Sequence, residues 1–293
     1  MSVQGEITET NGPAAGTSTA GLASAEDWRA LLSRFSHIVL VANSEAVNLP
    51  ELRRDMPETA LFVFFNKVYK VLSEPFSGNA LLVARSGTMG ANIVHRRETS
   101  DVLKFFPNPG FLGILNIRVE AGERLSPPAD FGSAPAGHLD LASYFTDFYP
   151  AGKLATSGFA MALWLSELQV PGRIVLAGFS ARRSERWKVF SIHDWTFEQV
   201  FLRLFSRLGK IEIVGGAQAS SFAGLAKRFP DVPPAEIALV AAEVLSERLE
   251  NTDNQIDRLM SITKGLRSLD NFFRRLKPKT RKERFLAAQQ KDG

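Results

Sequence analysis

The sequence predicts an α/β fold: a Rossmann-like, mainly parallel sheet flanked by helices, with a helical C-terminal extension. Short, continuous apolar runs recur along the chain as far as Val214, and such runs are typical of strands buried on both faces of a parallel sheet. Helical patterns and loops alternate with these runs, as in consecutive βαβ units. After Gly215 only helical patterns remain. These three observations define the predicted architecture.

Polar or small residues follow several of the predicted strands. The strands are His37–Ala42, Ala60–Phe65, Ala80–Ala84, Phe111–Val119, Ile174–Ala177 and Ile211–Val214. Asn43-Ser44 follows the first strand, Asn66-Lys67 the second and Gly178-Phe179 the fifth. Because ligands of open α/β sheets bind beyond the carboxyl ends of the strands, we expect Asn43-Ser44 to lie in a ligand-binding loop.

Between the strands, apolar residues at helical spacing predict helices. The predicted helices are Glu26–Phe35, Glu98–Phe106, Asp140–Tyr149, a helix opening at Ala155–Phe159 and ending near Leu168, and one from Thr196 to Leu208. The segment Glu120–His138 is rich in Pro, Gly and Ala, which predicts a long surface loop.

The chain divides into three predicted parts. Residues 1–25 are small and polar, without the apolar segment of a secretory signal, and are expected to form a disordered leader. Residues 26–216 are expected to form the α/β domain. Residues 217–293 form a helical extension with a basic tail, whose helices are expected at Ala235–Leu249 and Asn254–Leu276.

Composition excludes several classes of site. The 293-residue chain has a net charge of +4 and no cysteine, so disulfides, thiolate catalysis and cysteine-ligated zinc are excluded. It has no run of about 18 apolar residues that would span a membrane. There is no Gly-x-Gly-x-x-Gly after the first strand and no Walker loop, which weighs against dinucleotide and ATP binding. We expect a cytoplasmic protein.

A histidine at the start of a helix is the leading catalytic candidate. His193 precedes a predicted helix start at which Thr196 and Gln199 fit a capping box and Asp194 is a second possible cap. The positive end of the helix dipole holds a nearby imidazole neutral, as a general base near pH 7 requires. The alternative is that His193 is only a polar residue beside a cap.

Three segments resemble the motifs of the sialyltransferase family, in the family's order. Val41-Ala42-Asn43-Ser44 and Phe64-Phe65-Asn66 resemble the two ends of its large motif. Ala155-Thr156-Ser157-Gly158-Phe159 resembles its small motif, with Gly178-Phe179 at the close. His193 to Glu198 resembles its very small motif, a histidine and a glutamate separated by four residues.

This resemblance, over roughly His37 to Val214, implies a glycosyltransferase A-like variant of the fold and an inverting transferase. The sugar is sialic acid or a related ulosonic acid such as Kdo, and it moves from a CMP-sugar donor to a hydroxyl of a glycan or glycolipid acceptor. His193 is the implied general base and Glu198 steadies its loop. The implied nucleotide-sugar-binding residues are Asn43, Ser44, Asn66, Thr156, Ser157, Gly158, Gly178 and Trp187. The absence of an Asp-x-Asp motif indicates a metal-independent reaction, with no cofactor beyond the donor.

The sequence also departs from the family pattern. Phe64 replaces the arginine of the large motif, and Ala155 replaces the proline of the small motif. A histidine that binds the donor phosphate in the family is missing from Trp187-Lys188-Val189-Phe190, where Lys188, Arg186 or Arg183 are possible substitutes. The alternative function is therefore a divergent, non-catalytic α/β module that binds a nucleotide.

Basic residues crowd the C-terminal end. Seven Lys and Arg residues between Arg274 and Arg284 face a single acid, Glu283, and follow Phe272-Phe273. Interleaved aromatic and basic residues suit an anionic membrane surface, so we expect peripheral attachment to the inner face of a membrane. The alternative is a solvated tail. Nucleic acid is not an expected partner, because the rest of the chain is nearly neutral.

Overall fold

The computed structural model describes residues 18–85, 87, 92–146, 148–180 and 192–214, together with scattered positions between 231 and 249. The chain divides into two compact units, Met1–Gly216 and Ala217–Gly293. In the second unit, every described position from 235 to 249 is helical. The predicted helix Asn254–Leu276 and the basic tail lie outside the described residues.

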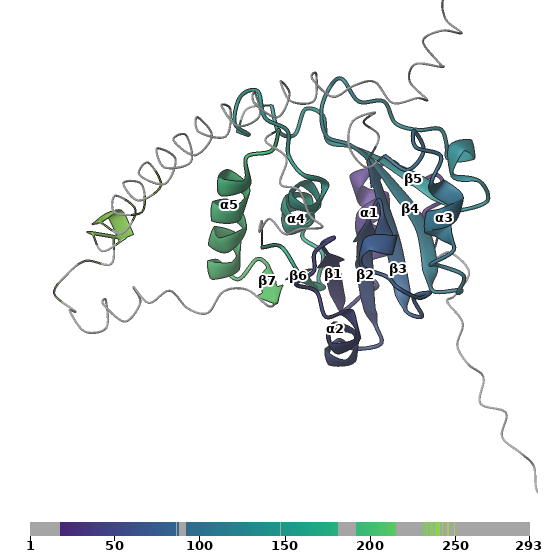
Figure 1. Ribbon diagram of the computed structural model, residues 1–293, viewed down its shortest axis with the longest axis horizontal. Coiled ribbons are helices and arrows are strands. Elements are labelled where there is room, and N and C mark those ends of the chain that lie inside the picture. The colour runs from purple at the N-terminus through teal and green to yellow at the C-terminus, as the bar shows by residue number, and fades with distance from the viewer. Residues whose placement is uncertain are drawn as a thin grey trace, which may run out of the picture. The chain divides into compact units, whose positions relative to one another are not determined.

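The first unit is built on one seven-stranded sheet in which every pairing is parallel (Figure 1). The predicted α/β class is confirmed. The strand order is β5-β4-β3-β2-β1-β6-β7. The strands are β1 (His37–Val41), β2 (Ala60–Phe65), β3 (Asn79–Arg85), β4 (Phe111–Arg118), β5 (Ala136–Asp140), β6 (Arg173–Ala177) and β7 (Glu212–Val214).

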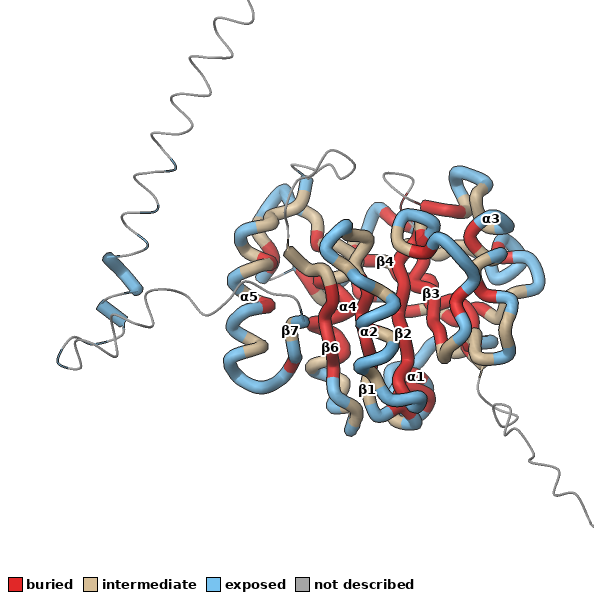
Figure 2. Tube along the Cα trace, turned by 60° about the horizontal axis from the view of Figure 1, so that its bottom comes forward, coloured by how far each residue is buried: buried red, intermediate tan, exposed pale blue. Residues whose placement is uncertain are grey.

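Helices cover both faces of this sheet. One face packs against α1 (Ala25–Leu32), α4 (Ser157–Leu168) and α5 (Trp195–Arg207). The other packs against α2 (Leu49–Asp55), α3 (Thr99–Leu103) and the 3₁₀ turns η1 (Val68–Lys70) and η2 (Pro128–Phe131). The central strands are therefore buried along their length, whereas much of α5 is exposed (Figure 2).

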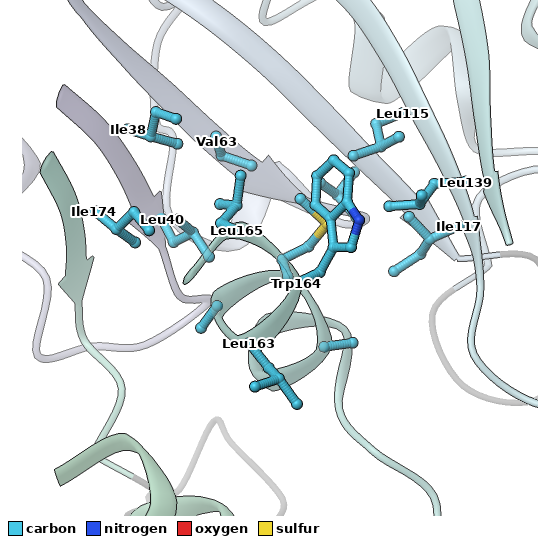
Figure 3. Close-up of a cluster of buried hydrophobic side chains, with 14 of the residues drawn as sticks. Ile38, Leu40, Val63, Leu115, Ile117, Leu139, Leu163, Trp164, Leu165 and Ile174 are labelled. Atoms are coloured by element: carbon cyan, nitrogen blue, oxygen red, sulfur yellow. The ribbon is translucent and has the colours of Figure 1, made fainter. Parts of the chain in front are cut away.

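Helix α4 is the most deeply buried helix of this layer. Every residue from Phe159 to Leu165 is buried. The helix is therefore covered by other parts of the chain on its outer side as well as by the sheet. Figure 3 shows Trp164 and Leu165 directed at the strands, with Trp164 beside Leu115, while Leu163 lies on the side away from them. This packing fixes the position of the N-terminus of α4.

The strand order creates a switch point between β1 and β6. From β1 the chain builds the sheet outward through β5, then returns to place β6 on the other side of β1. The connection after β1 leads to α2 on one face, and the connection after β6 leads to α5 on the opposite face. In open α/β sheets this divergence forms the ligand-binding crevice at the carboxyl ends of the strands.

The folded unit begins earlier than the sequence predicted. The expected leader ended at residue 25, yet Thr19 is buried and its N–H donates to Leu112 O (3.0 Å). The His138 N–H donates to Leu22 O (2.7 Å), so this segment covers the outer edge of β5. Ser24 then caps α1 in a capping box with Asp27. Residues 1–17 lie outside the described residues.

Two further predictions differ from the structure, and one helix was not predicted. The segment Glu120–His138 is not only a loop, because it contains η2 and the start of β5. The predicted helix Asp140–Tyr149 does not form at the described positions, where Asp140 ends β5 and turns follow. Helix α2 was not predicted, although Asn48 caps it by accepting from Glu51 N.

Among the helices that the described residues form, none combines the length and the apolar character needed to cross a bilayer.

Candidate functional site

The segment before α5 places His193 at the carboxyl edge of the sheet. Asp194 is the N-cap of α5, because its side chain accepts from Phe197 N (2.9 Å); the predicted capping box at Thr196 is wrong. The Nδ1 atom of His193 lies 2.7 Å from the carbonyl oxygen of Leu154. A carbonyl oxygen can only accept, so Nδ1 carries the hydrogen and Nε2 of the neutral ring holds a free lone pair.

The surroundings of His193 favour the neutral imidazole. Burial lowers the pKa of His193 below its ordinary value, the hydrogen bond to Leu154 opposes this change, and the positive charge of Arg85 adds to it. The ring of Trp195 packs edge-on, with the two ring centres 5.4 Å apart. A half-buried neutral histidine with an unprotonated Nε2 has the properties of a general base.

Glu198 joins the start of α5 to the start of α4. Its carboxylate accepts from Tyr149 OH (2.8 Å), Thr156 N (2.8 Å) and Thr156 Oγ1 (2.7 Å). The Tyr149 oxygen also accepts from Asp194 N (3.2 Å). Burial raises the pKa of Glu198, although these hydrogen bonds and Arg85 favour the carboxylate. Glu198 has a solvent exposure of only 3%, so this buried carboxylate holds the starts of α4 and α5 together.

The N-terminus of α4 presents free backbone donors. Thr156 is the N-cap, and its Oγ1 accepts from Phe159 N (3.1 Å). Ser157 and Gly158 are the first two helical residues, and among the described residues their N–H groups have no hydrogen-bond partner. Such groups and the helix dipole favour an anion.

A phenylalanine from the β6 loop lies against this helix start. A Cβ atom at Gly158 would lie 2.6 Å from Cε1 of Phe179, so the ring contacts the helix only because Gly158 has no side chain. The backbone of Phe179 is held by Gln199 of α5, whose Nε2 donates to the Phe179 carbonyl (3.1 Å). Phe179, in the loop after β6, therefore contacts both α4 and α5.

The strand ends contribute the two predicted asparagines. Asn43 Nδ2 donates to Phe65 O (2.9 Å), which ties the end of β1 to the end of β2. Asn66 Oδ1 accepts from Arg85 N (3.0 Å), which ties β2 to β3. Asn66 has a φ of 42°, a left-handed conformation that asparagine tolerates better than most residues. Each side chain keeps half of its amide, Oδ1 of Asn43 and Nδ2 of Asn66, outside these bonds.

Ser44 and Gly178 meet at the switch point itself. Gly178 has a φ of 79°, and a Cβ atom there would lie 3.1 Å from the Ser44 Cβ and 2.4 Å from a methyl group of Val47. The loops after β1 and β6 are therefore in close contact, and glycine is required for both the conformation and the approach.

Two residues that the sequence analysis did not select belong to the same site. Arg85, at the end of β3, donates from Nε to Glu123 Oε1 (2.6 Å) and from Nη1 to Ala155 O (2.6 Å). Tyr149 links Glu198 to Asp194. A cation directly after a buried strand was the available signal for Arg85. The partners of Tyr149 lie more than forty residues away, so nothing local identified it.

The structure thus brings most of the predicted site residues to one edge of the sheet. They are His193, Glu198, Asn43, Ser44, Asn66, Thr156, Ser157, Gly158 and Gly178. Trp187 and the three cations proposed beside it, Arg183, Arg186 and Lys188, lie outside the described residues. Within the described ranges, no group of three or more His, Asp or Glu side chains is arranged to hold a metal ion.

One cavity of about 550 Å³ lies elsewhere, at the opposite edge of the sheet. Its lining includes Gln169 after α4, Arg173 at the start of β6 and Lys210 before β7. It lies beside the amino ends of the strands, whereas open α/β sheets bind ligands at the carboxyl ends. The cavity therefore does not coincide with the candidate site.

In comparisons with known proteins, no family model and no curated protein sequence matches this chain.

Proposed function

We propose that this chain is an inverting glycosyltransferase that moves sialic acid, or a related ulosonic acid such as Kdo, from a CMP-sugar to a hydroxyl of a glycan or glycolipid. The observation that carries the proposal is the hydrogen bond between His193 Nδ1 and Leu154 O (2.7 Å). It leaves Nε2 unprotonated on a neutral ring, beside the switch point and the N-terminus of α4.

In this proposal the residues act in two roles. His193 Nε2 accepts the proton of the acceptor hydroxyl as the hydroxyl oxygen attacks the anomeric carbon, and the bond from that carbon to the CMP phosphate breaks. Negative charge then grows on the phosphate. The N–H groups of Ser157 and Gly158, with the dipole of α4, supply electrostatic stabilisation to this phosphate or to the sugar carboxylate.

The donor class comes from the resemblance to sialyltransferases, and the strand ends support it. Asn43 keeps an acceptor, Oδ1, and Asn66 keeps two N–H donors on Nδ2, after their bonds to the strands are counted. A ribose or a cytosine edge offers both kinds of partner. CMP carries a single phosphate, whose departure needs less neutralisation by a divalent ion than a diphosphate does.

Calorimetric titration with CMP tests this proposal. We expect the wild type and His193→Ala to bind CMP, and Asn43→Ala and Asn66→Gly to lose binding; glycine at position 66 retains the left-handed backbone. Asn79→Ala is the matched control, because Asn79 ties β3 to the β2 region at the opposite edge of the sheet. A folded wild type that does not bind CMP would contradict the proposal. The alternative, a non-catalytic α/β module that binds a different ligand, would then be favoured.

Location and membrane attachment form a second part of the proposal. A cytosolic enzyme attached to the inner face of a membrane through its basic residues 271–293 would reach a lipid-linked acceptor. The absence of cysteine from the chain supports the compartment. Sedimentation with anionic vesicles, with and without residues 271–293, tests the attachment, which equal binding by both proteins would refute.

A further inference from the structure

A buried ion pair lies beside the candidate base. Arg85 and Glu123 have side-chain exposures of 12% and 6%, and their Nε and Oε1 atoms are 2.6 Å apart. The second carboxylate oxygen of Glu123 accepts from Val119 N (2.7 Å). Replacing such a pair by apolar residues is often neutral or stabilising for a fold. Stability alone therefore gives a weak reason for this pair to be present.

The pair is connected to His193 through two successive carbonyl groups. Arg85 Nη1 donates to the carbonyl of Ala155 (2.6 Å), and His193 Nδ1 donates to the carbonyl of Leu154 (2.7 Å). The next residue, Thr156, is held through its N–H and hydroxyl by Glu198. The segment Leu154–Thr156 is thus held from β3 on one side and from the start of α5 on the other.

We propose that Arg85 is a positioning residue for His193: held by Glu123, it fixes the Leu154–Thr156 segment and so directs the Leu154 carbonyl at Nδ1. Because a carbonyl oxygen can only accept a hydrogen bond, this contact fixes the tautomer in which Nδ1 is protonated and Nε2 is not. The inference rests on the proposed function in that it assigns His193 the role of base.

Arg85 also acts on His193 through its charge. Its positive charge lowers the pKa of His193 and so opposes protonation of the ring. Among the described residues of this hydrogen-bond network, the other titratable groups are Glu123 after β4, Tyr149 before α4, and Asp194 and Glu198 at the start of α5. Glu198 is engaged by Thr156 and Tyr149, and Asp194 by its helix cap.

Imidazole nitrogen NMR of the full-length protein tests the proposal, because nitrogen shifts report both tautomer and protonation. One variant is Arg85→Lys, which keeps the charge but lacks the planar fork that reaches Glu123 and Ala155 together. The second variant combines Arg85→Gln with Glu123→Gln, which removes the charge without leaving a buried carboxylate unpaired. Arg118→Gln is the matched control: Arg118 also ends a strand and pairs with an acid, Asp140 (3.4 Å).

We expect wild type and Arg118→Gln to show His193 protonated on Nδ1 with a lowered pKa. In the double variant the Nε2-protonated form should appear, with a small change in the pKa, because loss of the Arg85 charge raises the pKa and loss of the Leu154 bond lowers it. Arg85→Lys should also show mixed tautomers, with a pKa below that of the wild type, because the charge remains while the Leu154 bond weakens. An unchanged tautomer of His193 in a folded double variant would overturn the proposal.

The outcome is separable from that of the proposed function. If the histidine signals change as expected but CMP does not bind, the positioning role stands and the transferase proposal fails. If CMP-sugar turnover is found while the histidine signals are identical in all variants, the transferase proposal stands and the positioning role fails. Circular dichroism of each variant confirms that it is folded.

Discussion

Glu198 provides the sharpest prediction, because opposing effects meet at one carboxylate. Its oxygens accept three hydrogen bonds from Tyr149 and Thr156, yet burial raises its pKa. The cost of burying the charge therefore exceeds what these bonds and Arg85 return. A glutamine at this position can still accept from Tyr149 OH and Thr156 N with its oxygen, and its NH₂ group can donate to Thr156 Oγ1.

The two substitutions should consequently differ. We expect Glu198→Gln to lie within about 1 kcal/mol of the wild-type free energy of unfolding at neutral pH. Glu198→Ala loses three hydrogen bonds at about 1 kcal/mol each and leaves the Tyr149 hydroxyl hydrogen and the Thr156 N–H without acceptors, a loss of at least about 3 kcal/mol. At about 2–4 °C per kcal/mol, the melting temperature should fall by about 6–12 °C.

The pH dependence has a definite sign. Because the pKa of Glu198 is raised on folding, its protonated form favours the folded state. Its contribution to stability is full below the unfolded pKa and is lost as the pH rises through the folded pKa. Glu198→Gln should remove this dependence, so its stability relative to the wild type should improve as the pH rises.

Urea denaturation across a pH series measures these differences. The matched control is Glu167→Ala, because Glu167 also accepts from a tyrosine, Tyr144, but is exposed. That control should change stability by no more than about 0.5 kcal/mol. If Glu198→Ala is as stable as Glu167→Ala, or if Glu198→Gln is as damaging as Glu198→Ala, the account of this buried network is wrong.

Three further predictions concern the fold and the site. Gly137→Ala should lower the free energy of unfolding by about 1–3 kcal/mol, because the new Cβ would lie 2.6 Å from Thr19 O and 2.7 Å from Trp28. The control Gly122→Ala, whose Cβ meets nothing nearer than 3.7 Å, should be neutral in the same urea titration. Equal effects of the two substitutions would refute the packing of the Thr19 segment against β5. Gly158→Ala should displace the Phe179 ring and weaken CMP binding in calorimetry with little change in melting temperature; undiminished affinity would show that the ring and helix start do not form the donor site. Tyr149→Phe, which removes the hydroxyl between Glu198 and Asp194, should lower stability by about 1–2 kcal/mol, and an unchanged melting temperature would contradict its place in the network.

Several strands of the sheet could be predicted because they are continuous apolar runs. His37–Val41 and Ala60–Phe65 are buried between two helical layers, so hydrophobicity alone identified them almost to the residue. β5 could not be found in this way. Its five residues, Ala136–Asp140, include a glycine and a histidine, and its outer edge is covered by the segment at Leu22, more than a hundred residues earlier.

Some residues of the candidate site could likewise be predicted from the sequence, and others could not. Asn43, Asn66 and Gly178 follow strands, and His193 precedes a helix, so local position was enough to select them. The roles of Arg85, Tyr149 and Glu123 come from contacts 38 to 70 residues apart, which no local pattern encodes. Glu198 was selected through the motif, but its partners, Thr156 and Tyr149, required the structure.

The most direct test of the central claim is release of CMP from CMP-sialic acid and from CMP-Kdo, followed across a pH series for wild type and His193→Gln. We expect the wild type to release CMP from at least one donor. Because the pKa of His193 is lowered, the rate should fall only at a pH below the ordinary histidine value. His193→Gln should bind CMP but not release it from either donor. Equal rates for the two proteins, or no release by a wild type that binds CMP, would contradict the assignment of His193 as the base of a CMP-sugar transferase.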